Sequence, residues 1–108
     1  MKIITLTLNP AFDIHCHAES LQLEHENLVH RDLCQAGGKG VNISRALVNN
    51  GMDNGALLVL GQENADSFLQ NLDADGVAYD TILVSGRIRE NITIHTGSTE
   101  TRISFPGF

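Results

Sequence analysis

A glycine-rich stretch in the first half of the chain holds the residues best suited to chemistry. Gly37, Gly38 and Gly40 surround Lys39, and apolar residues at helical spacing follow them. Glycines before a helix allow positive φ values and close backbone approach, and the helix N-terminus offers unpaired N–H groups with a partial positive charge. Together with the Lys39 ammonium, these groups suit the binding of an anion or of sugar oxygens.

Two well-known phosphate-binding loops do not fit this stretch. A Walker loop requires Ser or Thr directly after its lysine, but Gly40 follows Lys39. The dinucleotide fingerprint would begin at Gly38 and end on Ile43, where a glycine is required. On the spelling of the loop alone, a glycine-rich turn that binds no ligand stays open as an alternative.

Strand and helix patterns alternate along the chain. Three runs predict strands of a parallel sheet, the first alternating with Thr and the other two wholly apolar and typical of strands buried on both faces: 3–8, 56–60 and 81–84. Apolar residues at helical spacing predict two helices: 40–50 and 65–73. This alternation favours an α/β protein with a parallel sheet and flanking helices.

Other segments mix apolar and polar residues and predict strands with one wet face. They are 13–19, 28–35, 91–96 and 101–105. The last two flank a Gly97-Ser98 turn and predict a hairpin. We expect these segments to form a small antiparallel sheet beside the parallel one.

Composition narrows the function classes. Seven Lys and Arg against thirteen Asp and Glu leave a net charge of −6 on 108 residues. Nucleic-acid surfaces need clustered positive charge and a membrane span needs about 20 apolar residues, so neither partner is expected. Cys16 and Cys34 form no CxxC pair, which favours reduced thiols. The start of the chain lacks the features of a secretory signal, and we expect a cytoplasmic protein.

Two histidines raise the question of a metal site. His15 and His17 would share one face of a strand, where they could bind zinc. No spaced second pair completes four ligands, so no metal site is predicted.

The stretch 36–61 resembles the first signature of the PfkB, or ribokinase-like, carbohydrate kinases. The matching residues are Ala36, Gly37, Gly38, Lys39, Gly40, Val41, Asn42, Ile43 and Ser44, followed by Gly51 and Gly61. The segment 87–92 also fits the family's Thr-Arg-x-Asn strand, with Ile88 where Thr is usual. The turn 7–13 and the closing 105–108 look most like family members that phosphorylate fructose 1-phosphate.

The resemblance implies a fold and its parts. Residues 1–108 would be the N-terminal portion of a PfkB-type kinase domain with a ribokinase-like α/β fold. Its core would comprise about 1–10 and 38–86, and a small β-sheet lid would comprise about 13–35 and 91–105. Such lids close over the sugar and often form the dimer interface, so a homodimer through the lid is expected.

The resemblance also implies substrate-binding residues. They are Asp13, Gly37, Gly38, Lys39, Asn42 and Arg89. Asp13 and Asn42 would contact sugar hydroxyls, while the two glycines, Lys39 and Arg89 would lie against the sugar phosphate. A turn-capping role for Asp13 and a solvated edge-strand role for Arg89 remain as alternatives.

The implied activity is phosphorylation of a sugar phosphate by ATP with Mg²⁺. Fructose 1-phosphate is the expected substrate; tagatose 6-phosphate, another sugar, or a non-catalytic lid or dimerisation module are the alternatives. The family's catalytic base lies in a Gly-Ala-Gly-Asp segment, which does not occur in these 108 residues. We therefore expect no catalytic residue, no bound cofactor and no activity in this chain alone. An incomplete fold would expose the strand 57–60 and the helix face of Phe68 and Leu72.

Overall fold

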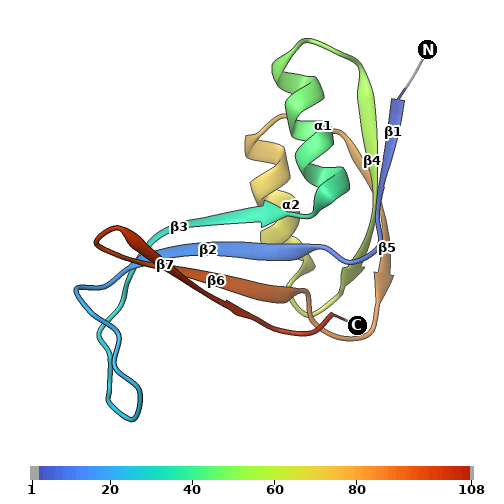
Figure 1. Cartoon of the computed structure of the whole chain (residues 1–108). Coiled ribbons are helices and arrows are strands. Elements are labelled where there is room, and N and C mark those ends of the chain that lie inside the picture. Colours follow the sequence, from blue (N-terminus) through green and yellow to red (C-terminus); the bar gives the residue numbers. More distant parts are fainter. Residues whose placement is uncertain (1–2, 108) are drawn as a thin grey trace.

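Two β-sheets meet at an angle in the computed structural model, which describes residues 3–107 (Figure 1). The strands are β1 (Ile3–Thr7), β2 (Ala11–His17), β3 (His30–Gly37), β4 (Asn54–Gly61), β5 (Tyr79–Val84), β6 (Arg89–Thr96) and β7 (Thr99–Ser104), and the helices are α1 (Lys39–Asn49) and α2 (Ala65–Ala74). The mixed α/β class predicted from the sequence is confirmed. Residues 1–2 and 108, which the predicted core and closing motif include, lie outside the described residues.

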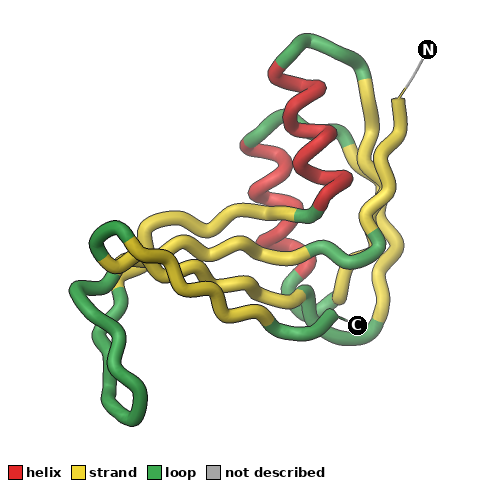
Figure 2. The backbone as a smooth tube through the Cα atoms, viewed as in Figure 1, coloured by secondary structure: helices red, strands yellow, loops and turns green. Residues whose placement is uncertain are grey.

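The first sheet, called here the core sheet, consists of β1, β4 and β5 in parallel, with β4 in the centre. Figure 2 shows α1 and α2 on the same side of this sheet. Leu58 and Leu60 of β4 face that side and are fully buried with Phe68 and Leu72 of α2. The expected exposure of the Phe68 and Leu72 helix face is therefore wrong, because this face is the one that packs on the core.

The opposite face of the core sheet is open within residues 3–107. Ile4 and Leu6 of β1 are 66% and 56% exposed, and Ile82 of β5 is 53% exposed. Leu57 and Val59, which alternate with the buried β4 residues, are half-buried. The apolar runs were predicted to be buried on both faces, and this is wrong for the second face, because both described helices cover the first. Neither helix is long and apolar enough to cross a membrane.

The second sheet, called here the side sheet, has the strand order β3-β2-β6-β7. The outer pairs, β2 with β3 and β6 with β7, are antiparallel as predicted, but the central pair β2 and β6 is parallel. The prediction of a wholly antiparallel sheet is therefore wrong. The reason lies in the core sheet: β1 and β5 run in the same direction, and each passes through a short connection into one of these two strands.

The side sheet has one apolar and one polar face, as period-two alternation requires. Phe12, Ile14 and Cys16 of β2 point into the core and are buried. The Phe12 ring packs edge-on against Phe68 of α2, with ring centroids 5.4 Å apart, and so joins the side sheet to the helix layer. The intervening β2 residues, including Asp13, lie on the polar face.

Candidate functional site

A cavity of about 740 Å³ lies where the core sheet turns into the side sheet. Three parts of the chain form it: the end of β1 with the turn after it, the start of α1, and the polar face of the side sheet. The residues that line it are Leu6, Thr7, Leu8, Asn9, Ala11, Asp13, Gly38, Lys39, Gly40, Asn42, Arg89, Asn91 and Arg102.

The structure brings five of the six expected substrate-binding residues to this cavity. Asp13, Gly38, Lys39, Asn42 and Arg89 line it. The sixth, Gly37, lies directly behind Asp13: a Cβ atom on this glycine would overlap the Asp13 carboxylate. Residues from β2, α1 and β6, which are distant in the sequence, thus meet at one place.

The glycine-rich stretch forms a very short connection between β3 and α1. Gly37 is the last residue of β3 and Lys39 the first of α1, so Gly38 alone makes the turn, with φ 132°. That conformation favours glycine. A Cβ on Gly38 would lie 2.8 Å from Thr7 Cγ2, and one on Gly40 would lie 2.8 Å from the Leu6 carbonyl oxygen. The absence of side chains therefore allows the start of α1 to lie against the end of β1.

Buried polar atoms without partners gather at this cavity. Thr7 Oγ1, Arg89 Nε and Asn91 Oδ1 are buried and make no hydrogen bond, and all three residues line it. Within residues 3–107 only one other side-chain atom is in this state, Asn54 Oδ1. Since buried polar groups are normally paired, the cluster indicates a ligand that supplies both donors and acceptors.

The charge of the cavity has the opposite sign to that of the whole chain. Lys39, Arg89 and Arg102 line it, and Asp13 is the only carboxylate among the described lining residues. The chain carries a net charge of −6, so this local excess of positive charge marks a site for an anion. The Asp13 carboxylate can accept hydrogen bonds from hydroxyl groups of the same ligand.

Arg45 positions the start of α1 and was not singled out from the sequence. Its guanidinium donates to Asn42 Oδ1 (3.2 Å), to the Ala36 carbonyl oxygen (2.8 Å) and to Asp75 Oδ2 (2.8 Å). It therefore links α1 to the end of β3 and to the residue after α2. A sequence signal existed, since Arg45 follows Asn42 by three positions on one helix face.

Other signature residues act structurally. The Ser44 hydroxyl hydrogen-bonds Thr5 Oγ1 at 2.6 Å, entirely buried, and joins α1 to β1. A Cβ on Gly61 would lie 2.7 Å from the backbone at Gly86 and Arg87, which crosses the end of β4. Gly51 has φ 71° just after α1, with open space around it. Space is the constraint at Gly61, and backbone conformation is the constraint at Gly51.

Thr7, Asn91 and Arg102 are site residues that sequence reasoning missed. Asn91 had a signal, because it is the Asn of the Arg-x-Asn pattern on β6. Thr7 begins the turn 7–13 that carries part of the family resemblance. Arg102 had no signal, since its place depends on how β7 meets the other elements.

The two histidines considered as metal ligands, His15 and His17, each stack on another histidine. His15 stacks on His95 and His17 on His30, with ring centroids 5.9 and 5.0 Å apart. No group of three His, Cys, Asp or Glu side chains in residues 3–107 is arranged to hold a metal ion.

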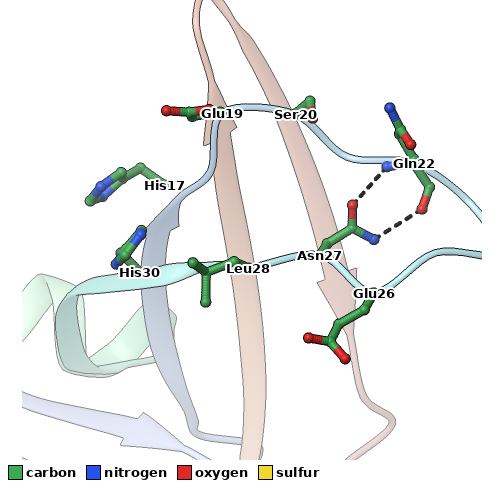
Figure 3. Close-up of a pocket in the computed structure, with 8 residues that line it drawn as sticks. All are labelled: His17, Glu19, Ser20, Gln22, Glu26, Asn27, Leu28 and His30. Atoms are coloured by element: carbon green, nitrogen blue, oxygen red, sulfur yellow. Dashed lines mark hydrogen bonds between the residues drawn. The ribbon is translucent and has the colours of Figure 1, made fainter.

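A second cavity, of about 480 Å³, lies at the far end of the side sheet, under the connection from β2 to β3 (Figure 3). It is lined by His17, Glu19, Ser20, Gln22, Glu26, Asn27, Leu28 and His30. The Asn27 side chain closes the connection on itself, donating to the Gln22 carbonyl oxygen at 2.9 Å and accepting from its N–H at 2.8 Å. No Lys or Arg and no unpaired buried side-chain atom of the described residues lies here, so the anion site is the first cavity.

Comparisons with known proteins identify the family to which this fold belongs. Residues 7–106 match the model of the pfkB family of carbohydrate kinases. This chain belongs to that family, which confirms the resemblance noted from the sequence.

Relatives in the family carry more specific names. The chain is 33% identical to 1-phosphofructokinase of Escherichia coli K12 over 99% of its own length and 35% of the relative's. It is 36% identical to 1-phosphofructokinase of Borreliella burgdorferi over 94% of its own length and 33% of the relative's. The chain therefore spans about a third of the length of these curated relatives.

Solved structures share the fold. A possible 1-phosphofructokinase from Thermotoga maritima is 30% identical and superposes with a TM-score of 0.84 over 100% of this chain and 36% of that chain. Phosphofructokinase-2 from Escherichia coli, in complex with substrates and products, superposes with a TM-score of 0.91 at 24% identity over 99% of this chain and 36% of that one. At that identity the second likeness shows the fold alone.

Proposed function

We propose that this chain supplies the sugar-phosphate-binding part of an ATP-dependent kinase that converts fructose 1-phosphate to fructose 1,6-bisphosphate. The observation that carries the proposal is the cavity between the two sheets, where Thr7, Arg89 and Asn91 leave buried polar atoms unpaired beside a net positive charge. The names of the relatives, 1-phosphofructokinase in each case, support the choice of substrate.

The lining residues divide into two tasks. The Asp13 carboxylate holds sugar hydroxyls, and the Asn42 amide donates to and accepts from others. Lys39, Arg89 and the free N–H groups at the start of α1 offset the charge of the phosphate. Gly37 keeps space behind Asp13. The side sheet then acts as a lid over the bound sugar.

The described residues of the cavity do not fit a nucleotide with Mg²⁺. Asp13 is the one carboxylate among the described residues of the cavity, and residues 3–107 hold no cluster suited to a metal ion. When bound, ATP supplies the phosphoryl group. We propose that the base and the nucleotide site come from polypeptide outside these 108 residues, and that this chain alone binds and orients the sugar phosphate without catalysis.

We also propose self-association through the side sheet. Its edge strands β3 and β7 present exposed apolar side chains, Leu33 (52% exposed) and Ile103 (46% exposed). Unpaired strand edges of this kind are templates for pairing with another chain. Sedimentation velocity is expected to show a dimer that Leu33→Glu or Ile103→Glu weakens. A monomer at all concentrations would contradict this.

Calorimetric titration of the purified chain tests the main proposal. Saturable binding of fructose 1-phosphate is expected, tighter than binding of fructose 6-phosphate or tagatose 6-phosphate and unchanged by ATP with Mg²⁺. Asp13→Asn and Arg89→Ala should each weaken binding by about tenfold or more, because each removes a hydrogen bond with a charged partner. Arg31→Ala, on the side sheet away from the cavity, is the control.

Two results would contradict the proposal. A folded chain that binds none of these sugar phosphates would remove the binding function. Measurable turnover in a coupled kinase assay would show that the chain is active alone, against the proposed division of the site.

A further inference from the structure

Arg102 stands between the sugar-phosphate cavity and a smaller neighbour. This neighbour is a third cavity, of about 290 Å³, which adjoins the sugar-phosphate cavity along the polar face of the side sheet. Asp13, Asn91 and Arg102 line both. Asp13 and Asn91 are paired across β2 and β6, whereas Arg102 comes from the edge strand β7. Arg102 is therefore the outermost of the three cations around the site.

The guanidinium of Arg102 is largely uncommitted. Its side chain is 76% exposed, and its Nε donates to Glu100 Oε1 at 2.8 Å. Within residues 3–107 no other hydrogen bond of this guanidinium is present. Glu100 lies two residues earlier on the same face of β7, with His95 Nδ1 4.0 Å from its other carboxylate oxygen. The pair thus holds a cation at the rim of the cavity by one exposed contact.

An exposed ion pair of this kind is weak, because water and salt screen it. A phosphate dianion offers a guanidinium two or more oxygens in a matching geometry, whereas Glu100 takes only Nε. The cavity already carries Lys39 and Arg89, which attract such an anion. The balance favours exchange of the Glu100 contact for a contact with substrate.

We propose that Arg102 is a specificity-determining residue that selects phosphorylated sugars by leaving Glu100 and binding the substrate phosphate. The inference rests on the proposed sugar-phosphate function and adds a lid residue to that site. Glu100 then acts as a competitor for Arg102: it holds the guanidinium in place in the free protein and weakens substrate binding.

This competition has a signature that a structural role would not produce. Arg102→Gln should weaken fructose 1-phosphate binding by about tenfold, because a charge-assisted contact is lost. Glu100→Gln should strengthen it by about twofold to threefold, since a weak exposed pair no longer competes. If the pair merely stabilised the hairpin of β6 and β7, both changes would weaken binding together.

The control is a matched ion pair outside the sugar-phosphate cavity and the 290 Å³ cavity beside it. Arg87, two residues before β6, and Glu90, the second residue of β6, form a contact of 2.9 Å. Neither residue lines the sugar-phosphate cavity or the 290 Å³ cavity beside it. Arg87→Gln and Glu90→Gln should leave fructose 1-phosphate binding within about twofold of wild type. Circular dichroism and thermal unfolding of each variant confirm that the fold is retained.

The experiment is calorimetric titration of the 108-residue chain and its variants with fructose 1-phosphate, with fructose and with inorganic phosphate. Arg102→Gln should reduce binding of the two phosphate compounds, and Arg102→Lys should restore part of it. Any weak binding of fructose should be unchanged.

Each outcome bears on one proposal. Wild-type affinity for fructose 1-phosphate in Arg102→Gln, or weakened binding in Glu100→Gln, would overturn the role of Arg102 and leave the proposed function standing. Failure of the wild-type chain itself to bind any sugar phosphate would overturn the proposed function and this inference with it.

Discussion

The helix-covered face of the core sheet and the polar face of the side sheet are built in opposite ways. On the first, Leu58, Leu60 and Phe68 have no exposed surface and need no polar partner. On the second, Arg89 and Asn91 keep buried polar atoms without partners. Apolar burial drives folding, whereas unpaired polar groups cost stability unless a ligand satisfies them. The helix-covered face of the core sheet therefore stabilises the fold, and the polar face of the side sheet recognises the ligand. Substitutions on the first face should lower stability, and substitutions on the second should weaken binding.

The largest loss of stability should come from removing the contact between α2 and the side sheet. Phe68→Ala removes a fully buried ring and its edge-on contact with Phe12, and should lower the free energy of unfolding by about 4 kcal/mol. Leu83→Ala, on β5 where the side chain is 56% exposed, is the control and should cost less than about 1 kcal/mol. Chemical denaturation measures both. Equal costs would show that the helix layer does not carry the stability.

Arg45→Ala should lower both the stability of the fold and the affinity for fructose 1-phosphate. The guanidinium is mostly buried and bonds Asp75, the Ala36 carbonyl oxygen and Asn42, so its loss should cost about 2 kcal/mol of unfolding free energy. Because Asn42 loses its support, fructose 1-phosphate binding should also weaken. Arg45→Lys keeps the charge but not the fork of donors and should recover little. Unchanged stability together with unchanged binding would show that the hydrogen bonds of Arg45 are dispensable.

Substitution of two signature glycines should have different effects, one on ligand binding and the other on stability. Gly37→Ala would displace the Asp13 carboxylate and should weaken fructose 1-phosphate binding by about tenfold with little loss of stability, because the strand backbone accepts alanine. Gly51→Ala should cost about 1 kcal/mol of stability, since φ is 71°, and leave binding unchanged. Titration and thermal unfolding of both variants give the comparison. Lower stability with unchanged binding in Gly37→Ala, together with weaker binding in Gly51→Ala, would contradict these roles.

The smallest effect concerns Cys34 on β3. Burial raises the pKa of its thiol, with Glu90 and Asp13 acting in the same direction and Arg31 opposing them. Since the thiolate is the reactive form, alkylation at neutral pH should be slower than for free cysteine and should rise as pH increases. Because the folded state holds this proton more tightly, its contribution to stability is lost as pH rises through the raised pKa.

Two variants sharpen this prediction. Arg31→Gln removes the group that lowers the pKa and should slow alkylation further, whereas Asp13→Asn should speed it. Mass spectrometry of iodoacetamide-treated protein gives the rates, with Cys34→Ser as the blank. A rate equal to that of free cysteine would contradict the raised pKa.

Much of this molecule was predictable because short-range patterns control it. Period-two alternation and helical spacing predicted every strand and helix to within a few residues, since local backbone preferences and burial of one face act over a few positions. The glycine pattern of the signature predicted the family. Gly38 and Gly51 need a positive φ, Gly40 and Gly61 meet close backbone atoms, and Gly37 meets the Asp13 carboxylate. Five of the six expected site residues line one cavity, and their role in substrate binding stays a prediction.

The remaining features depend on which elements meet, and no local pattern records that. The parallel pairing of β2 and β6 follows from the common direction of β1 and β5. The open face of the core sheet follows from both helices lying on one side. Arg102 enters the site only because the edge strand β7 approaches the same cavity as the end of β1. Contacts between distant segments are set by the packing of the whole chain, so they are visible only once it is folded.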